Sequence, residues 1–272
     1  MNYEKFLPEQ RLLPYVKYFY KLVSANSKSR QDHKTLRIIT DGCPGIIFQS
    51  PETGHFSVDQ KKLPTAFLFG QSTKHADLSL YGNFDTVGVA LHPNALTEVF
   101  GLDASSYTDS CIELGSISSE TRAVTDLLSE AQTIEGKVQI LQTFLARSVE
   151  IYQPNSPGDM QYAMNQIMLT NGTISLKSLQ ETIRIPQRSF ERKFKQYIGI
   201  SPKLFARICS FQASLRQLNS HQFNRLSEIA YRHQYSDQSH FIRSFREFSG
   251  LSPTTYYKKT NEVIDNLSEL LP

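Results

Sequence analysis

A unit of sixteen residues occurs twice near the C-terminus of this 272-residue chain, over residues 190–205 and 241–256. Every matched position lies 51 residues from its partner. Phenylalanines recur at i and i+4, and an arginine, a glycine, a serine and a proline stand at the same places in each copy. A repeat with a fixed offset predicts one supersecondary unit that the fold uses twice.

The residues of each copy predict a helix, its end and the start of another helix. The paired phenylalanines lie on one stripe that faces a core, and Arg192 and Arg243 point away from it. The glycine matches the left-handed residue that ends many helices, and the Ser-Pro pair is typical of an N-cap followed by a first helical residue. Short helices with capped starts are predicted upstream, at Ser175 and Ser227. The pattern therefore predicts two helix-turn-helix motifs.

A longer pattern surrounds the second copy, over residues 227–230, 235–241 and 245–253. It resembles the signature of the AraC/XylS family of transcription regulators, and residues 187–194 are similar but match more loosely. The resemblance implies an all-α domain in which a long helix, over residues 202–218, joins the two motifs. It also implies double-stranded DNA as the partner, contact with RNA polymerase, and the role of a bacterial activator.

Four residues depart from the family pattern. Gln180 stands where the family has a small alanine, Arg184 and Gln234 replace turn glycines, and Pro186 replaces a capping serine. A non-glycine residue costs about 1 kcal/mol where the backbone needs a positive φ. We expect the fold to survive these changes and the first motif to be the weaker of the two.

The charge of the chain is divided unevenly between its halves. Residues 1–152 hold 14 Lys and Arg against 17 Asp and Glu, whereas residues 159–259 hold 15 against 6. A neutral-to-acidic half joined to a basic half is typical of a regulatory module joined to a module that binds a polyanion. A solvated basic surface is the alternative, but the doubled motif favours DNA.

The first half reads as a series of short strands separated by turn residues, which is typical of a β-sandwich or barrel. The expected strands cover residues 15–23, 36–39, 46–48, 55–58, 66–69, 77–80 and 87–91, with a short helix up to Phe100. Residues 40–43, 70–71 and 88–95 resemble the cupin-like N-terminal domains of some AraC-type regulators. That resemblance implies a barrel that senses a small-molecule effector or mediates dimerisation.

Helical periodicity follows the strands, over residues 119–128 and 134–152. The apolar stripe of the second helix consists of Val138, Leu141, Leu145 and Val149, and it either packs on the barrel or forms a homodimer interface. Two prolines and a glycine at residues 154–158 predict a linker. The expected organisation is thus an α+β chain with a β-rich domain at 1–153, the linker, an all-α DNA-binding domain at 159–258 and a tail at 259–272.

The sequence offers little support for an enzyme or a cofactor. His33, His55, His75 and His92 include no His-x-His pair, so we expect no metal site and no cupin-type catalysis. Three scattered cysteines and the lack of a signal peptide favour the reducing cytoplasm. No apolar run is long enough to span a membrane.

The recognition helices supply the expected DNA-binding residues, which are Gln187, Arg188 and Arg192 in the first and Gln238, Ser239, Ile242 and Arg243 in the second. Asp237 either accepts from a cytosine or caps its own helix. The two arginines could instead form ion pairs with Glu191 and Glu247. We interpret the chain as a sequence-specific, effector-responsive transcription regulator. The alternative is an interaction or ligand-binding module whose degenerate motifs no longer read DNA.

Overall fold

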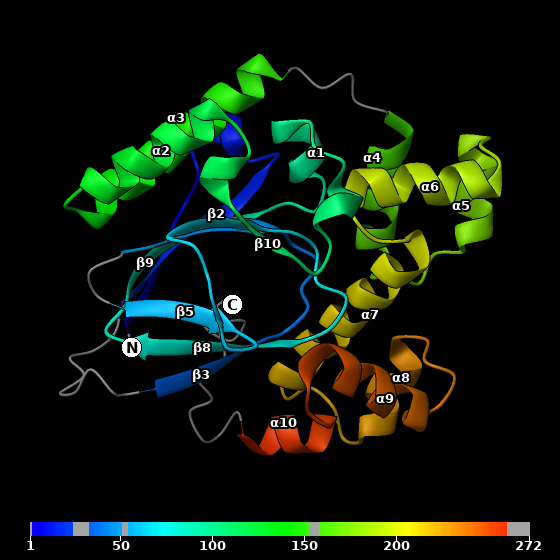
Figure 1. Ribbon diagram of the computed structural model, residues 1–272. Helices are drawn as coiled ribbons and strands as arrows, with labels where there is room; N and C mark the ends of the chain where they lie inside the picture. Colours follow the sequence, from blue (N-terminus) through cyan, green and yellow to red (C-terminus); the bar gives the residue numbers. More distant parts are fainter. Residues whose placement is uncertain (1, 24–32, 51–53, 153–157, 260–272) are drawn as a thin grey trace. The chain divides into compact units, whose positions relative to one another are not determined.

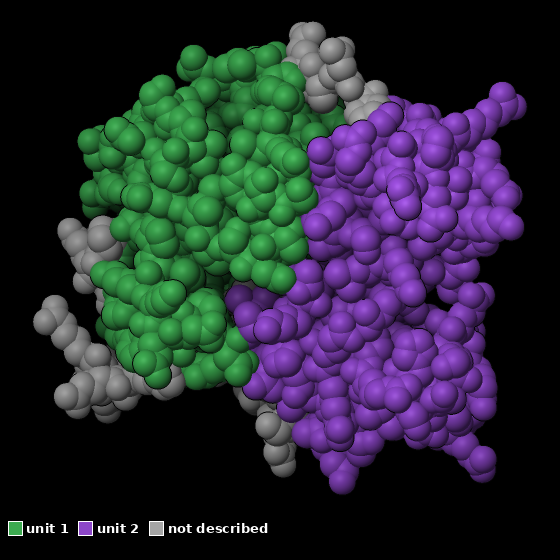
Figure 2. All heavy atoms as spheres, turned by 45° about the vertical axis from the view of Figure 1, so that its right-hand side comes forward, with its two compact units in different colours: residues 1–36, 43–71, 77–155 green, residues 37–42, 72–76, 156–272 purple. Residues whose placement is uncertain are grey.

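The computed structural model describes residues 2–23, 33–50, 54–152 and 158–259. They belong to two compact units, coloured separately in Figure 2. Unit 1 comprises residues 1–36, 43–71 and 77–155, and unit 2 comprises residues 37–42, 72–76 and 156–272. The α+β organisation expected from the sequence, with β-rich residues followed by a helical region, is confirmed. The proposed linker and tail lie outside the described residues, apart from Gly158 and Lys259.

Unit 1 contains most of two sheets (Figure 1). Sheet A has six strands in the order β1 (Asn2–Phe6), β2 (Val16–Val23), β9 (Asp85–Leu91), β4 (Gly45–Gln49), β7 (Ala66–Phe69) and β10 (Cys111–Glu113). Sheet B has four strands in the order β3 (His33–Ile38), β8 (Ala76–Gly82), β5 (Gly54–Val58) and β6 (Lys61–Lys62). The last two residues of β3 and the first residue of β8 belong to unit 2.

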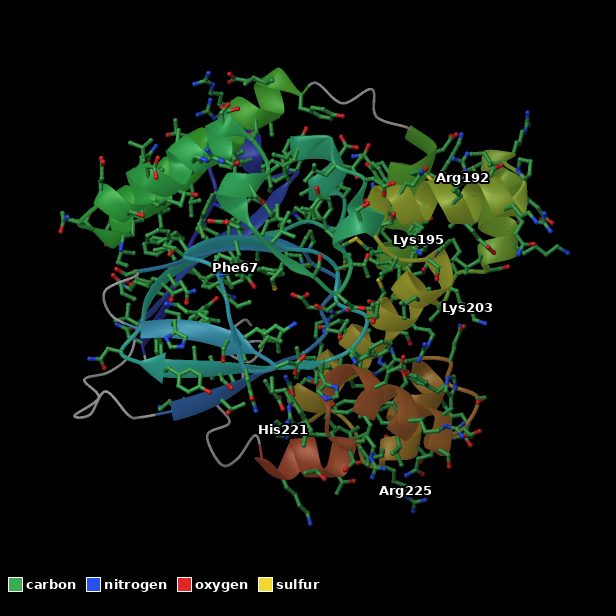
Figure 3. The ribbon with its side chains drawn as sticks, in the orientation of Figure 1. Phe67, Arg192, Lys195, Lys203, His221 and Arg225 are labelled. Carbon is green, nitrogen blue, oxygen red and sulfur yellow. The ribbon has the colours of Figure 1, made fainter. Side chains whose placement is uncertain are left out.

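The two faces of sheet A are buried against different partners. One face carries Phe19, Ile46 and Val89, which share a core with the helices that follow the sheet. These helices are α1 (Ala95–Phe100), α2 (Ser119–Glu130) and α3 (Ile134–Ile151). The other face carries Phe67, which lies between the two sheets in Figure 3 and is 2% exposed. Because successive side chains of a strand point to opposite faces of the sheet, the same strands supply apolar side chains to both faces.

A close approach inside sheet A depends on Gly88 of β9, which pairs with Tyr20 of β2. A Cβ atom at Gly88 would lie 2.2 Å from Cζ of the Tyr20 ring. The ring therefore folds over the space that a side chain would fill. Glycine at this position lets β2 and β9 pair in register with a tyrosine pointing across the strand.

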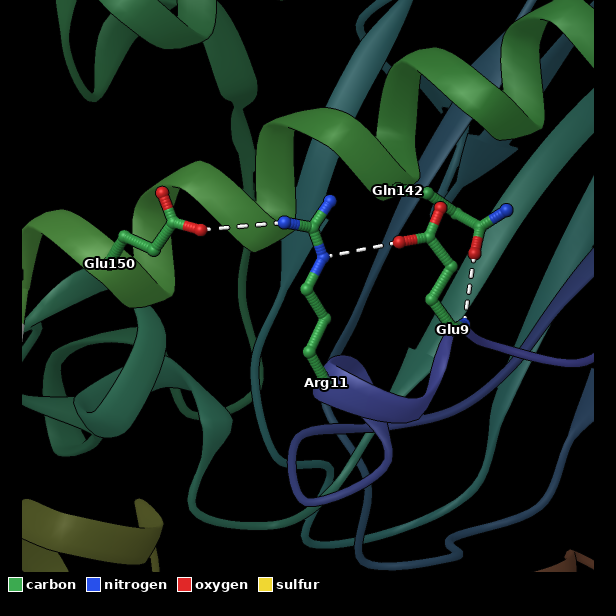
Figure 4. Close-up of polar contacts among 4 residues, drawn as sticks. All are labelled: Glu9, Arg11, Gln142 and Glu150. Carbon is green, nitrogen blue, oxygen red and sulfur yellow. Dashed lines mark hydrogen bonds and ion pairs between the residues drawn. The ribbon is translucent and has the colours of Figure 1, made fainter.

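Helix α3 is fixed to unit 1 by apolar and polar contacts. The Nζ atom of Lys137 lies 3.2 Å from a carboxylate oxygen of Asp85 and 5.3 Å from the centre of the Phe48 ring. At its other end, Arg11 bridges Glu9 and Glu150, with nitrogen–oxygen distances of 3.1 and 3.4 Å (Figure 4). Most of the α3 apolar stripe lies in the core, where Leu141 and Leu145 are fully buried. Of the two roles weighed for this stripe, the structure therefore has packing against the sheet.

The described part of unit 2 is mainly helical, and the helices follow the expected doubled pattern. They are α4 (Gly158–Leu169), α5 (Leu176–Ile183), α6 (Gln187–Ile198), α7 (Pro202–Asn219), α8 (Leu226–Arg232), α9 (Gln238–Ser249) and α10 (Pro253–Lys259). Helices α5 and α6 form the first helix-turn-helix motif, and α8 and α9 form the second. Their shared core holds both pairs of repeated phenylalanines.

The sequence repeat is also a repeat of ring contacts. In the first copy, the Phe194 ring lies 5.8 Å from Phe190 and 5.8 Å from Phe205 of the next helix. In the second copy, the Phe245 ring lies 5.7 Å from Phe241 and 5.5 Å from Tyr256. These separations are those of favourable tilted and edge-to-face pairs. In both copies, an aromatic ring contact therefore holds the recognition helix against the helix that follows it.

The helix ends mostly follow the expected capping. Ser201 and Ser252 accept hydrogen bonds from the backbone N–H groups of Leu204 and Thr255 at 3.3 and 3.1 Å. Gly199 ends its helix at a φ of 105°. The expectation that Ser227 caps a helix is wrong, because α8 already begins at Leu226 and the Glu228 carboxylate accepts from the Asn224 N–H at 3.0 Å.

Two turn residues adopt the left-handed conformation that the family pattern assigns to glycine. Arg184 has a φ of 55° and Gln234 a φ of 57°. Both lie between the two helices of a motif. The turn geometry is therefore kept, and the left-handed backbone strains these two non-glycine residues. The motifs are formed without the glycines, at a cost in stability.

Replacing Arg184 or Gln234 with glycine is therefore expected to raise the free energy of unfolding by about 1 kcal/mol each, because glycine relieves the left-handed strain. Urea unfolding of the full chain, followed by helical circular dichroism, measures the change. Lys193→Gly within α6 is the matched control and is expected to lose about 1 kcal/mol. A loss at Arg184 and Gln234 as large as at Lys193 would contradict the strain argument.

Candidate nucleic-acid interface

One side of α6 presents five side chains at i, i+1, i+4, i+5 and i+8, which we call the α6 face. They are Gln187, Arg188, Glu191, Arg192 and Lys195, and all are exposed. The opposite side buries Phe190 and Phe194 in the core of unit 2. Figure 3 labels Arg192 and Lys195 on this helix. Three of the five were expected from the sequence to read bases, whereas Lys195 was expected to contact phosphate and Glu191 was considered only as an ion-pair partner.

The α9 face occupies the same positions in the second motif, 51 residues later. Its members are Gln238, Ser239, Ile242, Arg243 and Arg246. All are exposed except Ile242, which is partly buried. Four of these residues were expected from the sequence, and Arg246 was not. The repeat therefore places two similar faces on the two recognition helices.

The arginines at the centre of the two faces form no ion pair with any described residue. The acids considered as their partners are occupied elsewhere. Glu191 accepts from Nε2 of Gln187 at 3.0 Å, and Glu247 pairs with Arg207 of α7. Arg192 and Arg243 thus keep their full set of donors toward solvent, as a planar two-pronged contact with a base requires.

Asp237 is the cap of α9 and not a member of the α9 face. Its carboxylate accepts from the His240 N–H at 2.7 Å and from the Ser236 hydroxyl at 3.3 Å. The His240 N–H is the main cause that holds the pKa of Asp237 below its ordinary value, with smaller contributions from Ser236, the Ser239 N–H and Arg243. Of the two roles considered for Asp237, the structure has the capping one.

The two recognition helices begin differently. No side chain caps α6, which follows Pro186, so its first backbone N–H groups are left without a side-chain acceptor. The cap of α9 is Asp237, and the His240 ring packs edge-on against Tyr235 with centres 5.3 Å apart. An uncapped helix N-terminus attracts anions such as phosphate. The α6 start offers such a site, while the α9 start is already occupied by a carboxylate.

The C-terminal end of α9 is held by two segments from the first half of the sequence, both part of unit 2. The Thr40 N–H donates to the Phe248 carbonyl at 3.1 Å, and the His75 N–H donates to the Glu247 carbonyl at 3.3 Å. The Thr40 carbonyl in turn accepts from the Gln212 side chain of α7 at 2.6 Å. These bonds satisfy carbonyls that have no partner within the helix.

Nearby side chains tighten the same contact. Ile39 is 2% exposed and belongs to the helical core of unit 2. A Cβ atom at Gly250, whose φ is 74°, would lie 2.7 Å from the His75 ring. Glycine is needed there both for the left-handed turn and for the close approach of His75. Sequence periodicity gives no signal for contacts between residues this far apart.

Comparison with known proteins bears on both halves of the chain. Residues 179–259 match a family model described as a helix-turn-helix domain. Over these residues the chain therefore contains a helix-turn-helix domain. This agrees with the two helix-turn-helix motifs expected from the sequence and supports a DNA-binding transcription regulator. Residues 4–113 match a model described as a domain of unknown function, DUF6597. No curated protein matches the chain.

Solved structures of ToxT from Vibrio cholerae are similar to this chain. The apo form of a single-residue variant from strain SCE256 shares 12% identity over 88% of this chain and 97% of that one, with a TM-score of 0.45. A form solved at 1.65 Å shares 11% identity over 88% and 98%, with a TM-score of 0.46.

Within the described residues, no group of three or more His, Cys, Asp or Glu side chains is placed to hold a metal ion. Among the same residues, no helix is long and apolar enough to cross a membrane.

The cap of α9 predicts a pH dependence. Because the pKa of Asp237 is lowered in the folded protein, its ionised form stabilises the fold above the pKa of the unfolded chain, about 3.9. This contribution is lost as the pH falls through the lower folded value. Asp237→Asn keeps an acceptor for the cap but no charge, so it is expected to be less stable than the wild type at pH 7.

The difference in urea midpoint between the wild type and Asp237→Asn should shrink as the pH is lowered from 7 through 4 and below. Glu181→Gln is the control, since this exposed carboxylate makes no side-chain hydrogen bond with a described residue. A difference for Asp237→Asn that stays constant over this range would contradict the lowered pKa.

Proposed function

We propose that the chain is a sequence-specific DNA-binding regulator in which α6 and α9 each read bases, and in which an effector acts through the N-terminal half. The observation that carries the DNA reading is the pair of equivalent faces on the two recognition helices. Each has a glutamine at its start and, one turn and a residue later, an exposed arginine with no ion pair to a described residue.

The chemistry of these faces suits the edges of base pairs in the major groove. Arginine donates two hydrogen bonds to O6 and N7 of guanine, and glutamine bonds to N6 and N7 of adenine. Arg192 and Arg243 fill the first role, and Gln187 and Gln238 the second. Arg188, Ser239 and Ile242 stand between them on the same faces and complete the proposed contact set.

The surroundings of the two faces favour phosphate. Lys195 and Arg246 stand at the same position of their helices, and both are exposed. The uncapped start of α6 adds backbone donors, which fix the position of a protein on DNA without reading sequence. Together with the basic balance of residues 159–259, these groups support electrostatic binding to a duplex.

The regulatory part of the proposal is supported by the way α9 is held. Residues 37–42 include the last two residues of β3, and residues 72–76 include the first residue of β8. The chain thus connects these strands directly to the segments bonded to the C-terminal end of α9. A small-molecule effector that shifts either strand would alter the bonds from Thr40 and His75. We place the protein in the cytoplasm with RNA polymerase as a further partner. A homodimer would need a surface other than the buried α3 stripe.

Base reading by the α9 face is tested with Arg243→Ala in the full chain. The variant is expected to lose about 1–3 kcal/mol of binding on the preferred duplex and to relax preference at one base pair, because a two-pronged contact with guanine is removed. Lys195→Ala is the matched control and should weaken all duplexes about equally. Affinities for one preferred and one scrambled duplex, measured at a single salt concentration, separate the two effects.

Equal losses of Arg243→Ala on both duplexes would mean that this arginine binds phosphate and that α9 does not read a base through it. A wild-type protein that binds no duplex even at low salt would favour the interaction module that had been weighed against a DNA reader.

The dependence of α9 on the first half of the chain is tested with Ile39→Ala. Ile39 and Leu36 are three residues apart and both are buried, but Ile39 packs in unit 2 and Leu36 belongs to unit 1. Emptying the Ile39 site costs about 2–5 kcal/mol. It should raise hydrogen exchange in α9 and weaken DNA binding, whereas Leu36→Ala should raise exchange mainly in unit 1. Equal effects of the two variants on α9 would remove this support for coupling.

A further inference from the structure

The α6 face and the α9 face can be compared position by position because of the constant offset. The first and fourth members are identical in type, and the last is basic in both, as in Gln187 and Gln238, Arg192 and Arg243, and Lys195 and Arg246. The faces differ at the second and third members. The third member is Glu191 in α6 and Ile242 in α9, so an acid and an aliphatic side chain occupy one structural position.

Glu191 is an exposed acid on a face that is otherwise polar or basic. One of its carboxylate oxygens accepts from Nε2 of Gln187 at 3.0 Å, and the side chain forms no ion pair with a described residue. A carboxylate only accepts, so this bond also fixes which end of the Gln187 amide faces it. The second carboxylate oxygen still has its acceptor sites free for a donor on DNA.

Ile242 has the opposite character at the same position. It is partly buried, but it is not among the described apolar side chains that pack on the core of unit 2. Gln238, one turn before it, has no carboxylate to bind and makes no side-chain hydrogen bond with a described residue. The middle of the α9 face is therefore an apolar surface with an unrestrained amide beside it.

We propose that Glu191 and Ile242 are the residues that make the two motifs prefer different base pairs, with cytosine at the α6 site and thymine at the α9 site. This inference rests on the proposed binding of DNA by both helices. The inference adds a comparison of the two half-sites on the DNA. They are alike at the bases that the glutamine and the arginine contact, and they differ at the base that Glu191 or Ile242 contacts.

The base chemistry follows from the two side chains. A carboxylate accepts from the N4 amino group of cytosine and is repelled by the O6 and N7 acceptors of guanine and the O4 acceptor of thymine. An aliphatic side chain has no hydrogen bond to offer and gains most from contact with the thymine methyl group. An acid near phosphates binds poorly unless it meets such a donor, which makes Glu191 a selective element.

A simpler role for Glu191 is to stabilise α6 through its bond with Gln187. Such a pair one helical turn apart contributes about 0.2–0.5 kcal/mol. That role predicts a small change in folding stability and no change in base preference. The simpler role thus changes folding stability, whereas the proposed role changes base preference. One variant distinguishes the two roles.

The test selects preferred sites from a pool of randomised duplexes with the full-length wild type and with Glu191→Ile, which gives α6 the residue of α9. The variant is expected to change the ratio of cytosine to thymine at one base pair of one half-site by roughly tenfold, and to leave the other half-site unchanged. Glu191→Gln keeps an acceptor for Gln187 and removes the charge, so it should lose the cytosine preference without gaining thymine. Ile242→Glu should shift the other half-site toward cytosine.

Circular dichroism of each variant establishes that the helices are formed. Unchanged base preference in Glu191→Ile and Glu191→Gln, or a uniform gain in affinity on all duplexes, would overturn the inference and leave the proposed function standing. A wild type that selects no sequence from the pool would overturn the proposed function, and this inference with it.

Discussion

The arrangement of unit 2 depends on α7, whose aromatic side chains belong to both motifs. Near its start, the Phe205 ring packs on Phe194 of the first recognition helix at 5.8 Å. Almost two turns later, the Phe211 ring lies 5.3 Å from both Phe245 and Phe248 of the second. Aromatic pairs of this kind contribute about 0.5–1.5 kcal/mol beyond the area they bury. Because one rigid helix carries both contacts, neither recognition helix can shift without disturbing a core that the other shares.

The ends of α9 add a second constraint. At its start, the Asp237 carboxylate accepts from the His240 N–H, and at its end, the Glu247 and Phe248 carbonyls accept from His75 and Thr40. The bond at the start comes from Asp237, the residue that directly precedes the helix. The bonds at the end come from chain segments about 170 to 210 residues away. The same helix therefore takes its orientation from α7, its start from its own turn, and its end from the first half of the sequence.

The elements that were predictable from the sequence are those governed by local rules. The paired phenylalanines, the Ser-Pro helix starts and the glycine at 199 depend on residues within one or two turns, and all lie where the repeat placed them. The positive φ of Arg184 was predictable for the same reason, since the turn geometry is set by the two helices it joins. The strand β10 (Cys111–Glu113) was missed because three residues with no alternation carry too little pattern.

The misses at the site have a different cause. From the sequence, Glu191 was considered only as an ion-pair partner and Lys195 only as a phosphate contact, because an exposed charge on a helix is ordinary. The exposed side of α6 reveals that both join Arg192 on one face. Sequence could pose the alternatives for Asp237 and for the α3 stripe without deciding them, since each depends on which group comes close in space. Thr40 contacts α9 through its backbone N–H, which every residue possesses, and His75 adds its ring nitrogen Nδ1, 3.0 Å from the Glu247 carbonyl. Neither gave a signal, because both lie more than 170 residues from their partners in the sequence. Side-chain identity predicts a recognition helix and its face, whereas the bonds that hold its end join residues that only the folded chain brings together.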